Sequence, residues 1–348
     1  MLNKPRTLKD SNLAKEIIKE GGDIVPIMIP SSETNGLGIM NPSILIEGDE
    51  ILVNLRNVGY TFFHSDYDQK YHSRWGPLTY MHPENDLNLR TTNFLCKLNT
   101  ESLEVEAYAE IDTSKLDIPP VWEFIGLEDA RLARWDGKLY GIGVRRDVKP
   151  NGEGRMEFQE IEYNLDPKNH KNSYAKEVKR NRIQPPVDKN SYCEKNWMPI
   201  LDKPYHFVKW SHPTEVVKAN LKNNTSKQTL LADTAISLGR DLRGGSQIVR
   251  WNNQWFAVTH ELDPFNHNEL QLKDAYYFSR FVIWDDDWNI IKVSDAFSFM
   301  GARIEFTTGL AEYGEFFLMT FGYADAAAYT AKVPKKLIEK MLTEVSYE

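Results

Sequence analysis

Acidic and basic side chains lie at the two ends of one predicted hairpin. Glu128 and Asp129 begin its first strand, Asp136-Gly137 forms its turn, and Arg145 and Arg146 end its second strand. Asp-Gly between two apolar runs is the strongest short-range sequence signal for a hairpin. Because the chain folds back on itself, we expect the carboxylates to lie near the guanidinium groups. A carboxylic acid can protonate a leaving oxygen, and cations across from it can bind an anion such as phosphate.

The same design of strand, tight turn, strand and polar end recurs along the chain. Further copies span residues 43–57, 197–212, 246–261 and 308–325, with turns at 47–50, 202–203, 252–253 and near Gly314. Copies separated by roughly 50 to 90 residues are typical of a repeat architecture with insertions. The five copies predict an all-β fold, a five-bladed β-propeller that forms a single domain over residues 1–348.

Polar residues flank all of these hairpins, and a propeller would bring them together. Equivalent strand ends of all blades meet at one rim of the central channel. A polar strand end is ordinary by itself, but five in register, rich in Arg, Lys, His and Asp, predict a ligand site. The flanking residues include Asn41, Arg56, Asn57, Glu128, Asp129, Lys195, Asn196, Lys209, His212, Arg243, His260, Glu261, Glu305 and Asp325.

Four segments lie outside the hairpins. Residues 7–20 have helical spacing and end at Gly21-Gly22, and residues 333–345 have the same spacing, so we predict a short N-terminal helical strap and a closing C-terminal helix. The aromatic insertion at 60–93 could form a lid, a contact in a homo-oligomer or ordinary packing. The charged insertion at 147–190 reads as a solvated loop or short helix over 166–182.

Composition excludes several classes of function. The net charge of −8 lacks the basic footprint of a nucleic-acid binder, so no nucleic acid is expected as a partner. No apolar run is long enough for a membrane span and residues 1–20 lack the apolar core of an export signal, so the expected location is cytoplasmic. Cys96 and Cys193 are too few for a disulfide framework, and the eight histidines include no i, i+4 pair, so no metal site is expected.

Motifs in this order along the chain resemble those of glycoside hydrolase family 130, which contains β-mannoside phosphorylases and hydrolases. Gly126-Leu-Glu-Asp-Ala-Arg131, followed by Asp136-Gly-Lys-Leu-Tyr140, is similar to the family's G-x-E-D-P-R block and D-G-x-Y-Y strand pair. Weaker matches are Asn41-Pro-Ser43 with Arg56, Lys195-Asn196-Trp-Met-Pro199, Trp255-Phe-Ala-Val-Thr-His260 and Tyr323-Ala-Asp325. The family's five-bladed propeller is the fold that this resemblance implies.

The resemblance also implies metal-independent, inverting glycosyl transfer without a cofactor. Asp129 would donate a proton to the glycosidic oxygen, directly or through a sugar hydroxyl. The co-substrate would be inorganic phosphate or a nucleotide sugar, and the substrate an oligosaccharide or a sugar phosphate. Only the resemblance indicates that the sugar is mannose. The other implied site residues are Arg56, Asn57, Glu128, Arg131 and Asp325 around the sugar, and Lys195, Asn196 and His260 around phosphate.

Departures from the family motifs keep other functions open. Ala130 replaces the family's Pro, Lys195 stands where Arg is usual, and the Arg243-Gly-Gly-Ser246 element fits a sister group of inverting glycosyltransferases that use a nucleotide sugar. A hydrolase on the same fold would need a base carboxylate roughly 6.5 to 9.5 Å from the acid. Its candidates are Glu261, Asp263 and Glu305. A sugar-binding propeller without catalysis is a further alternative.

Overall fold

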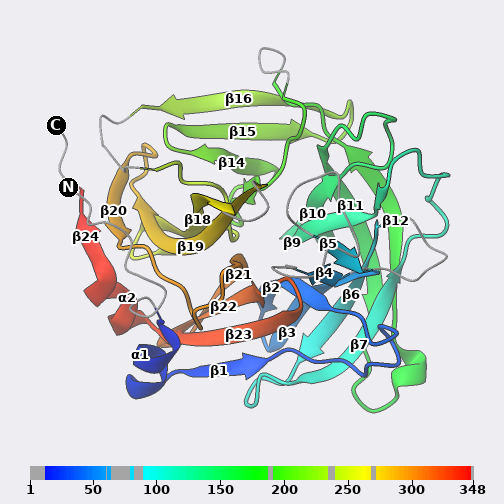
Figure 1. Ribbon diagram of the computed structural model, residues 1–348, viewed down its shortest axis with the longest axis horizontal. Helices are drawn as coiled ribbons and strands as arrows, with labels where there is room; N and C mark the ends of the chain where they lie inside the picture. Colours follow the sequence, from blue (N-terminus) through cyan, green and yellow to red (C-terminus); the bar gives the residue numbers. More distant parts are fainter. Residues whose placement is uncertain are drawn as a thin grey trace.

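Five blades of four antiparallel strands surround a central axis, and the chain passes through them in sequence order except that its first strand joins the last blade (Figure 1). The computed structural model describes residues 12–59, 61–63, 79–81, 89–186, 191–233, 240–267 and 272–345. Residues 7–11 of the predicted strap and most of the aromatic insertion at 60–93 therefore lie outside the described residues.

Each blade contains one of the predicted hairpins as its inner strand pair. Blade 1 consists of β2 (Ile39–Glu47), β3 (Glu50–Val58), β6 (Leu89–Leu98) and β7 (Val105–Asp112). Blade 2 consists of β9 (Leu127–Trp135), β10 (Lys138–Arg145), β11 (Arg155–Asn164) and β12 (Tyr174–Arg182). Blade 3 consists of β13 (Met198–Pro199), β14 (His206–Ser211), β15 (Thr214–Asn220) and β16 (Thr225–Ala232).

The last two blades complete the ring. Blade 4 consists of β17 (Val249–Trp251), β18 (Gln254–His267), β19 (Leu272–Trp284) and β20 (Ile290–Ser294), with β24 (Leu342–Glu344) added at its edge. Blade 5 consists of β21 (Glu305–Tyr313), β22 (Phe316–Tyr323) and β23 (Ala327–Pro334), and takes β1 (Asp23–Pro26) as its outer strand. Segments from both ends of the chain thus close the ring within one sheet.

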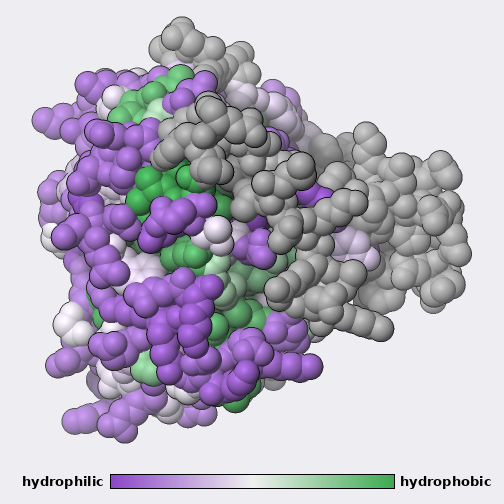
Figure 2. Space-filling model, turned by 90° about the vertical axis from the view of Figure 1, so that its left-hand side faces the viewer, coloured by the Kyte–Doolittle hydropathy of each residue, from purple (hydrophilic) through white to green (hydrophobic). Residues whose placement is uncertain are grey.

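Smaller elements cover or join the blades. Helix α1 (Ala14–Lys19) packs Ile17 into the same hydrophobic cluster as Leu337 and Ile338 of α2 (Lys335–Met341). Strands β4 (Thr61–Phe63) and β5 (Thr79–Met81) pair with each other, β8 (Phe124–Ile125) pairs with β6, and a 3₁₀ turn spans His170–Asn172. On the side of the molecule that carries α1, α2 and β24, hydrophilic residues predominate, with hydrophobic patches between them (Figure 2). No helix in the described part of the chain has the length and apolar character needed to cross a membrane.

The five-bladed all-β fold is confirmed. Local turn chemistry explains why the hairpins could be predicted from the sequence. Asp136 and Gly137 have φ of 52° and 75°, and Asn252 and Asn253 have φ of 50° and 62°. These residue types adopt positive φ at low cost, and the resulting tight turns match the right-handed twist of the flanking strands.

Outside the hairpins, one sequence expectation was wrong and another was right in kind but not in extent. Residues 166–182 are not a loop or short helix throughout, because Tyr174–Arg182 forms β12, the outer strand of blade 2. This strand pairs with β11 and, in parallel, with β7, so blades 1 and 2 share one nine-stranded sheet. The closing helix also ends early, at Met341, and the next three residues pair with β20.

One buried amide side chain links four of the five blades. Gln247 is 0% exposed, and its Nε2 donates to the carbonyl oxygens of Ile44 at 2.7 Å and Leu132 at 3.0 Å. Its Oε1 accepts from the backbone N–H of Leu310 at 3.0 Å. One side chain therefore joins blades 1, 2 and 5 to the start of blade 4.

We expect Gln247→Leu to lower the free energy of unfolding by at least about 2 kcal/mol, because each buried backbone group left without a partner costs about 1–3 kcal/mol. Urea unfolding monitored by tryptophan fluorescence measures the change. Gln228→Leu on the exposed edge strand β16 is the control and should change stability by less than about 0.5 kcal/mol. Equal stabilities of the two variants would contradict the role of Gln247.

Candidate active site

A cavity of about 450 Å³ opens at the rim of the ring and is lined by side chains from all five blades. Strand ends that are far apart in sequence meet here, as the propeller geometry requires. The lining residues are Met40, Asn41, Arg56, Phe124, Glu128, Asp129, Ser191, Cys193, Glu194, Lys195, Asn196, Lys209, Trp210, Arg243, Gly244, His260, Tyr277, Ile304, Phe306 and Asp325.

Local backbone distortions turn four of these side chains into the cavity region. Asn41, Asp129, Asn196 and Asp325 have φ of 44°, 51°, 60° and 50°, in the left-handed region that non-glycine residues seldom occupy. The pairing register shifts beside two of them, between Met40 and Ser43 and opposite Asp129 at Ile142/Val144. Such bulges redirect side chains and concentrate at functional sites.

The bulge at Asp129 requires a glycine on the neighbouring strand. Gly143 lies across from it, and a Cβ at that position would lie 2.3 Å from the carbonyl oxygen of Glu128. Any larger residue would push the two strands apart. Gly143 is therefore part of what positions the acidic pair.

Arg56 is the centre of the acidic side of the cavity. Its Nη1 donates to Asp129 Oδ1 at 2.8 Å, and its Nη2 lies 3.3 Å from Glu128 Oε2. Thr91 Oγ1 accepts from the same guanidinium at 3.1 Å, and Asn41 Nδ2 donates to Asp129 Oδ1 at 2.8 Å. The Arg56 side chain is only 5% exposed, so its charge acts on the carboxylates with little screening by solvent.

The three carboxyl groups of this side have different proton affinities. Burial alone would raise the pKa of Asp129, but Arg56, Arg131 and the hydrogen bond from Asn41 together hold that pKa below its ordinary value. Burial raises the pKa of Glu128 against the opposing effect of Arg56. Burial also raises the pKa of Asp325 to about 6, with Arg56 opposing and Asp129 adding to the shift. As the pH rises, Asp129 therefore loses its proton before Glu128 and Asp325 do.

The raised pKa of Asp325 predicts a pH-dependent effect of its removal. A carboxyl whose pKa is higher in the folded than in the unfolded state stabilises the fold below its unfolded pKa of 3.8, and this contribution is lost as the pH rises through about 6. We therefore expect the free energy of unfolding of Asp325→Asn, relative to that of the wild type, to be about 1–2 kcal/mol higher at pH 8 than at pH 4. Thermal unfolding across this range measures it, with exposed Asp241→Asn as control. Parallel pH profiles of wild type and Asp325→Asn would refute it.

Basic side chains line the other side, on blades 3 and 4. Lys195 is exposed, Asn196 and Arg243 are partly buried, and His260 is 3% exposed. His260 Nδ1 lies 3.0 Å from the carbonyl oxygen of Gly244, so Nδ1 carries the proton and donates it there. Burial, followed by Arg243 and Lys195, lowers the pKa of His260 to about 3. The ring is therefore neutral at neutral pH, and its Nε2 can accept the O–H of a hydrogen phosphate group.

Two of the expected ligand-binding residues lie behind the cavity wall. Arg131 is 1% exposed and donates to the carbonyl oxygens of Asp129 and Gly245, both at 2.7 Å, and to Asn196 Oδ1 at 3.4 Å. It thus connects the acidic and basic sides, and burial lowers its pKa to about 10. Asn57 donates to the carbonyl oxygen of Gly38 at 2.9 Å. Both side chains therefore lie outside the cavity lining and support the residues that form it.

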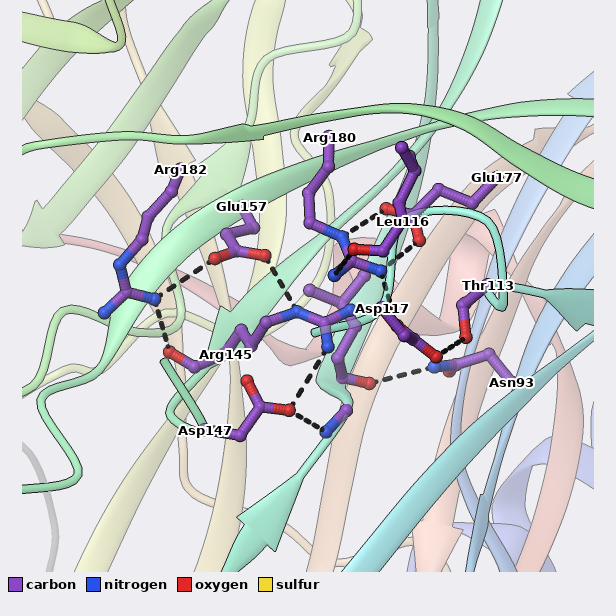
Figure 3. Close-up of polar contacts among 12 residues, drawn as sticks. Asn93, Thr113, Leu116, Asp117, Arg145, Asp147, Glu157, Glu177, Arg180 and Arg182 are labelled. Atoms are coloured by element: carbon purple, nitrogen blue, oxygen red, sulfur yellow. Dashed lines mark hydrogen bonds and ion pairs between the residues drawn. The ribbon is translucent and has the colours of Figure 1, made fainter. Parts of the chain in front are cut away.

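The hairpin brings Arg145 opposite Leu127 and Val144 opposite Glu128, so the arginines lie near the acidic pair as expected, but their side chains have other direct partners. Arg145 binds Glu157 at 2.8 Å and Asp147 at 3.3 Å, in an ionic network within blade 2 (Figure 3). Arg146 lies over the rings of Phe124 and Tyr192. The cation that contacts the acidic pair comes instead from the neighbouring blade, as Arg56.

The three carboxylates considered as a hydrolytic base have other partners. Glu261 pairs with Arg280 at 2.6 Å and Asp263 with Arg240 at 2.9 Å. Glu305 accepts the backbone N–H groups of Phe299, Met300 and Ala302. None of the three is among the residues that line the described cavity.

Several lining residues had no role assigned from the sequence. The sequence indicated Arg243 as a polar residue before a strand and as part of the Arg243-Gly-Gly-Ser246 element, but gave its side chain no role. The residue lies beside His260, because the two exchange backbone hydrogen bonds at 2.8 and 2.9 Å. The pair of glycines after it was the available signal. A Cβ at Gly244 would lie 1.8 Å from the carbonyl oxygen of Asn196, so this close approach requires glycine. Glu194, Trp210 and Tyr277 carried no sequence signal.

The fold and site define a five-bladed propeller with a polar funnel at one rim. No protein-family model and no curated protein matches the sequence. Among solved structures, a candidate glycosidase from Bacteroides thetaiotaomicron is similar with a TM-score of 0.52 and 11% identity, covering 86% of this chain and 88% of its own. A candidate glycoside hydrolase from Parabacteroides distasonis has a TM-score of 0.51 and 13% identity, covering 86% and 87%.

The two structures with TM-scores above 0.5 confirm the expected resemblance to propellers of carbohydrate-active enzymes at the level of fold. A third similar structure is the β-1,2-mannobiose phosphorylase from Listeria innocua, with a TM-score of 0.48 and 12% identity, covering 92% of this chain and 93% of its own.

Proposed function

We propose that the protein catalyses metal-independent, inverting glycosyl transfer, with a sugar phosphate as the activated partner and Asp129 as the acid–base residue. One observation carries the proposal: a single cavity holds Asp129, Glu128 and Asp325 around Arg56 on one side and Lys195, Arg243 and His260 on the other. The acidic side suits a sugar and its glycosidic oxygen, and the basic side suits phosphate.

The chemistry balances with phosphate as the nucleophile. A phosphate oxygen forms a bond to the anomeric carbon, the glycosidic C–O bond breaks, and the leaving oxygen takes a proton that originates from Asp129. In the reverse, synthetic direction, Asp129 takes the proton of the acceptor hydroxyl while phosphate leaves. No second carboxylate is needed in either direction, which agrees with the engagement of Glu261, Asp263 and Glu305 elsewhere.

The two directions start from different protonation states of Asp129. Because Arg56 and Arg131 hold its pKa below the ordinary value, Asp129 is a carboxylate at neutral pH. A carboxylate is the form that accepts a proton, so synthesis starts from this state directly, whereas phosphorolysis requires Asp129 to gain a proton first.

The test is turnover with three sets of substrates in parallel. Release of inorganic phosphate from α-mannose 1-phosphate plus a panel of sugar acceptors supports the sugar-phosphate reaction. Turnover of a nucleotide sugar alone assigns the basic side to a nucleotide's phosphates. Cleavage of β-mannosides in phosphate-free buffer makes the protein a hydrolase. Ligand binding without turnover in any set leaves a sugar-binding propeller.

Lys195 gives a sharper test of the basic side. We expect Lys195→Ala to raise the KM for phosphate about tenfold or more with a smaller change in kcat, because a charge-assisted contact is worth about 1.5–3 kcal/mol. Phosphorolysis rates over a phosphate series measure both constants. Lys222→Ala, the same change at an exposed site outside the cavity, is the control. An unchanged KM for phosphate would place the anion elsewhere.

A further inference from the structure

The cavity has a third region on blade 3 that the proposed chemistry does not use. Glu194, Lys209 and Trp210 line it, and we call these three residues the blade-3 cluster. Glu194 comes from the segment before β13, and the other two end β14, so the fold of one blade brings them together.

Glu194 presents an unpartnered oxygen. The residue is 4% exposed, and its Oε2 accepts the indole N–H of Trp197 at 2.9 Å. Its Oε1 is buried and has no hydrogen-bond partner within the described part of the chain. A buried carboxylate oxygen without a partner is costly, so an oxygen of this kind in a ligand cavity indicates a donor supplied by the ligand.

Lys209 lies between two carboxylates and has hydrogen-bonding capacity left. Its Nζ is 3.6 Å from a carboxylate oxygen of Glu194 and 3.6 Å from one of Glu215. These distances exceed the roughly 2.7–3.2 Å of a hydrogen bond, so the ammonium N–H groups can turn to a ligand. Because two carboxylates offset its charge, this ammonium attracts an anion less strongly than an isolated lysine would, and it can donate to the hydroxyl groups of an uncharged polyol.

We propose that Glu194, Lys209 and Trp210 form a subsite that binds the hydroxyl groups of a second, uncharged sugar ring. Glu194 Oε1 accepts a hydroxyl, Lys209 donates to another, and the ring of Trp210 packs against the C–H face of the sugar. The inference rests on the proposed function, since this second ring is the sugar that leaves in phosphorolysis and accepts in synthesis.

Calorimetric titration with β-1,2-mannobiose tests the subsite without requiring turnover. The parent is Asp129→Asn, which prevents reaction during the titration, and the variants add Trp210→Ala, Trp210→Phe or Glu194→Gln. We expect the alanine and glutamine variants to raise the Kd for β-1,2-mannobiose about tenfold or more, and Trp210→Phe to retain most of the affinity because an aromatic face remains. Titration with inorganic phosphate should give Kd values within about twofold of the parent.

Each result decides the question. Absence of β-1,2-mannobiose binding by the parent, an unchanged Kd in both Trp210→Ala and Glu194→Gln, or an equal loss of phosphate affinity would overturn the subsite. Should Glu194→Gln fail to fold, the two Trp210 variants alone decide, since Trp210 is partly exposed. Trp210-dependent binding together with no turnover in any substrate set would reject the proposed function and leave the subsite standing.

Discussion

Asp129→Asn is expected to lower kcat by about 10²–10⁴-fold while the protein stays folded and binds its ligands. The reason is that an amide cannot donate or accept the proton that the carboxyl group transfers. Asparagine is among the few residue types that adopt positive φ readily, so the backbone at φ 51° is preserved. Its side-chain oxygen can still accept from Asn41 and Arg56, which donate to Asp129 Oδ1 at 2.8 Å each.

The matched control is Asp136→Asn. Asp136 has nearly the same backbone conformation, with φ of 52°, but its carboxylate accepts the hydroxyl of Tyr205 at 2.7 Å outside the cavity. Steady-state kinetics in both directions, with thermal unfolding of each variant, separate a chemical loss from a structural one. Full turnover by Asp129→Asn in the direction that the wild type catalyses would remove Asp129 from the mechanism.

Arg56→Met is expected to destabilise the fold by about 3–5 kcal/mol at neutral pH, because it removes the cation that directly contacts the carboxylates of both Glu128 and Asp129. Their side chains are 17% and 16% exposed, so solvent replaces little of the lost interaction. Turnover should fall with it, since the same guanidinium fixes the orientation of Asp129.

The pH dependence of this variant follows from the direction of the Asp129 shift. A carboxyl whose pKa is depressed in the folded state stabilises the fold above its unfolded pKa of 3.8, and this stability is lost as the pH falls. The difference between wild type and Arg56→Met should therefore be largest at pH 7 and shrink as the pH falls through about 4. Urea unfolding at several pH values measures it.

Arg134→Met is the control for a cross-blade ion pair at the surface. Arg134 pairs with Glu47, with side chains 23% and 38% exposed, and such pairs contribute about 0–1 kcal/mol. A loss no larger for Arg56→Met than for this control would mean that Arg56 is not what stabilises the acidic pair.

Charge placement shows where sequence reasoning stops. Arg145 lies next to Leu127 in the pairing of β9 and β10, so its backbone is near the acidic pair as expected from the hairpin. Its side chain nevertheless binds Glu157 and Asp147, while Arg56 reaches Asp129 across 73 positions of sequence. Several cations were chemically equivalent candidates, and only the packing of neighbouring blades chooses between them.

The outer strands show a second limit. Residues of β12 alternate between exposed and buried, but most are Lys, Arg, Asn or Glu because one face of an outer strand meets solvent. Such a composition resembles a loop. It forms a strand because β11 and β7 supply hydrogen-bond partners on both sides, which no local pattern reveals.

The sequence by itself determined the five inner hairpins, and with them the number of blades, because turns such as Asp136-Gly137 and Asn252-Asn253 act through local backbone preferences. It also indicated the carboxylates and cations at the strand ends. Only the tertiary structure decided which of these meet: Arg56 with Asp129, Arg243 beside His260, and Glu194 beside Lys209. The reason is physical, since closing the ring fixes contacts between residues of different blades, and such contacts depend on the shape of the whole assembly.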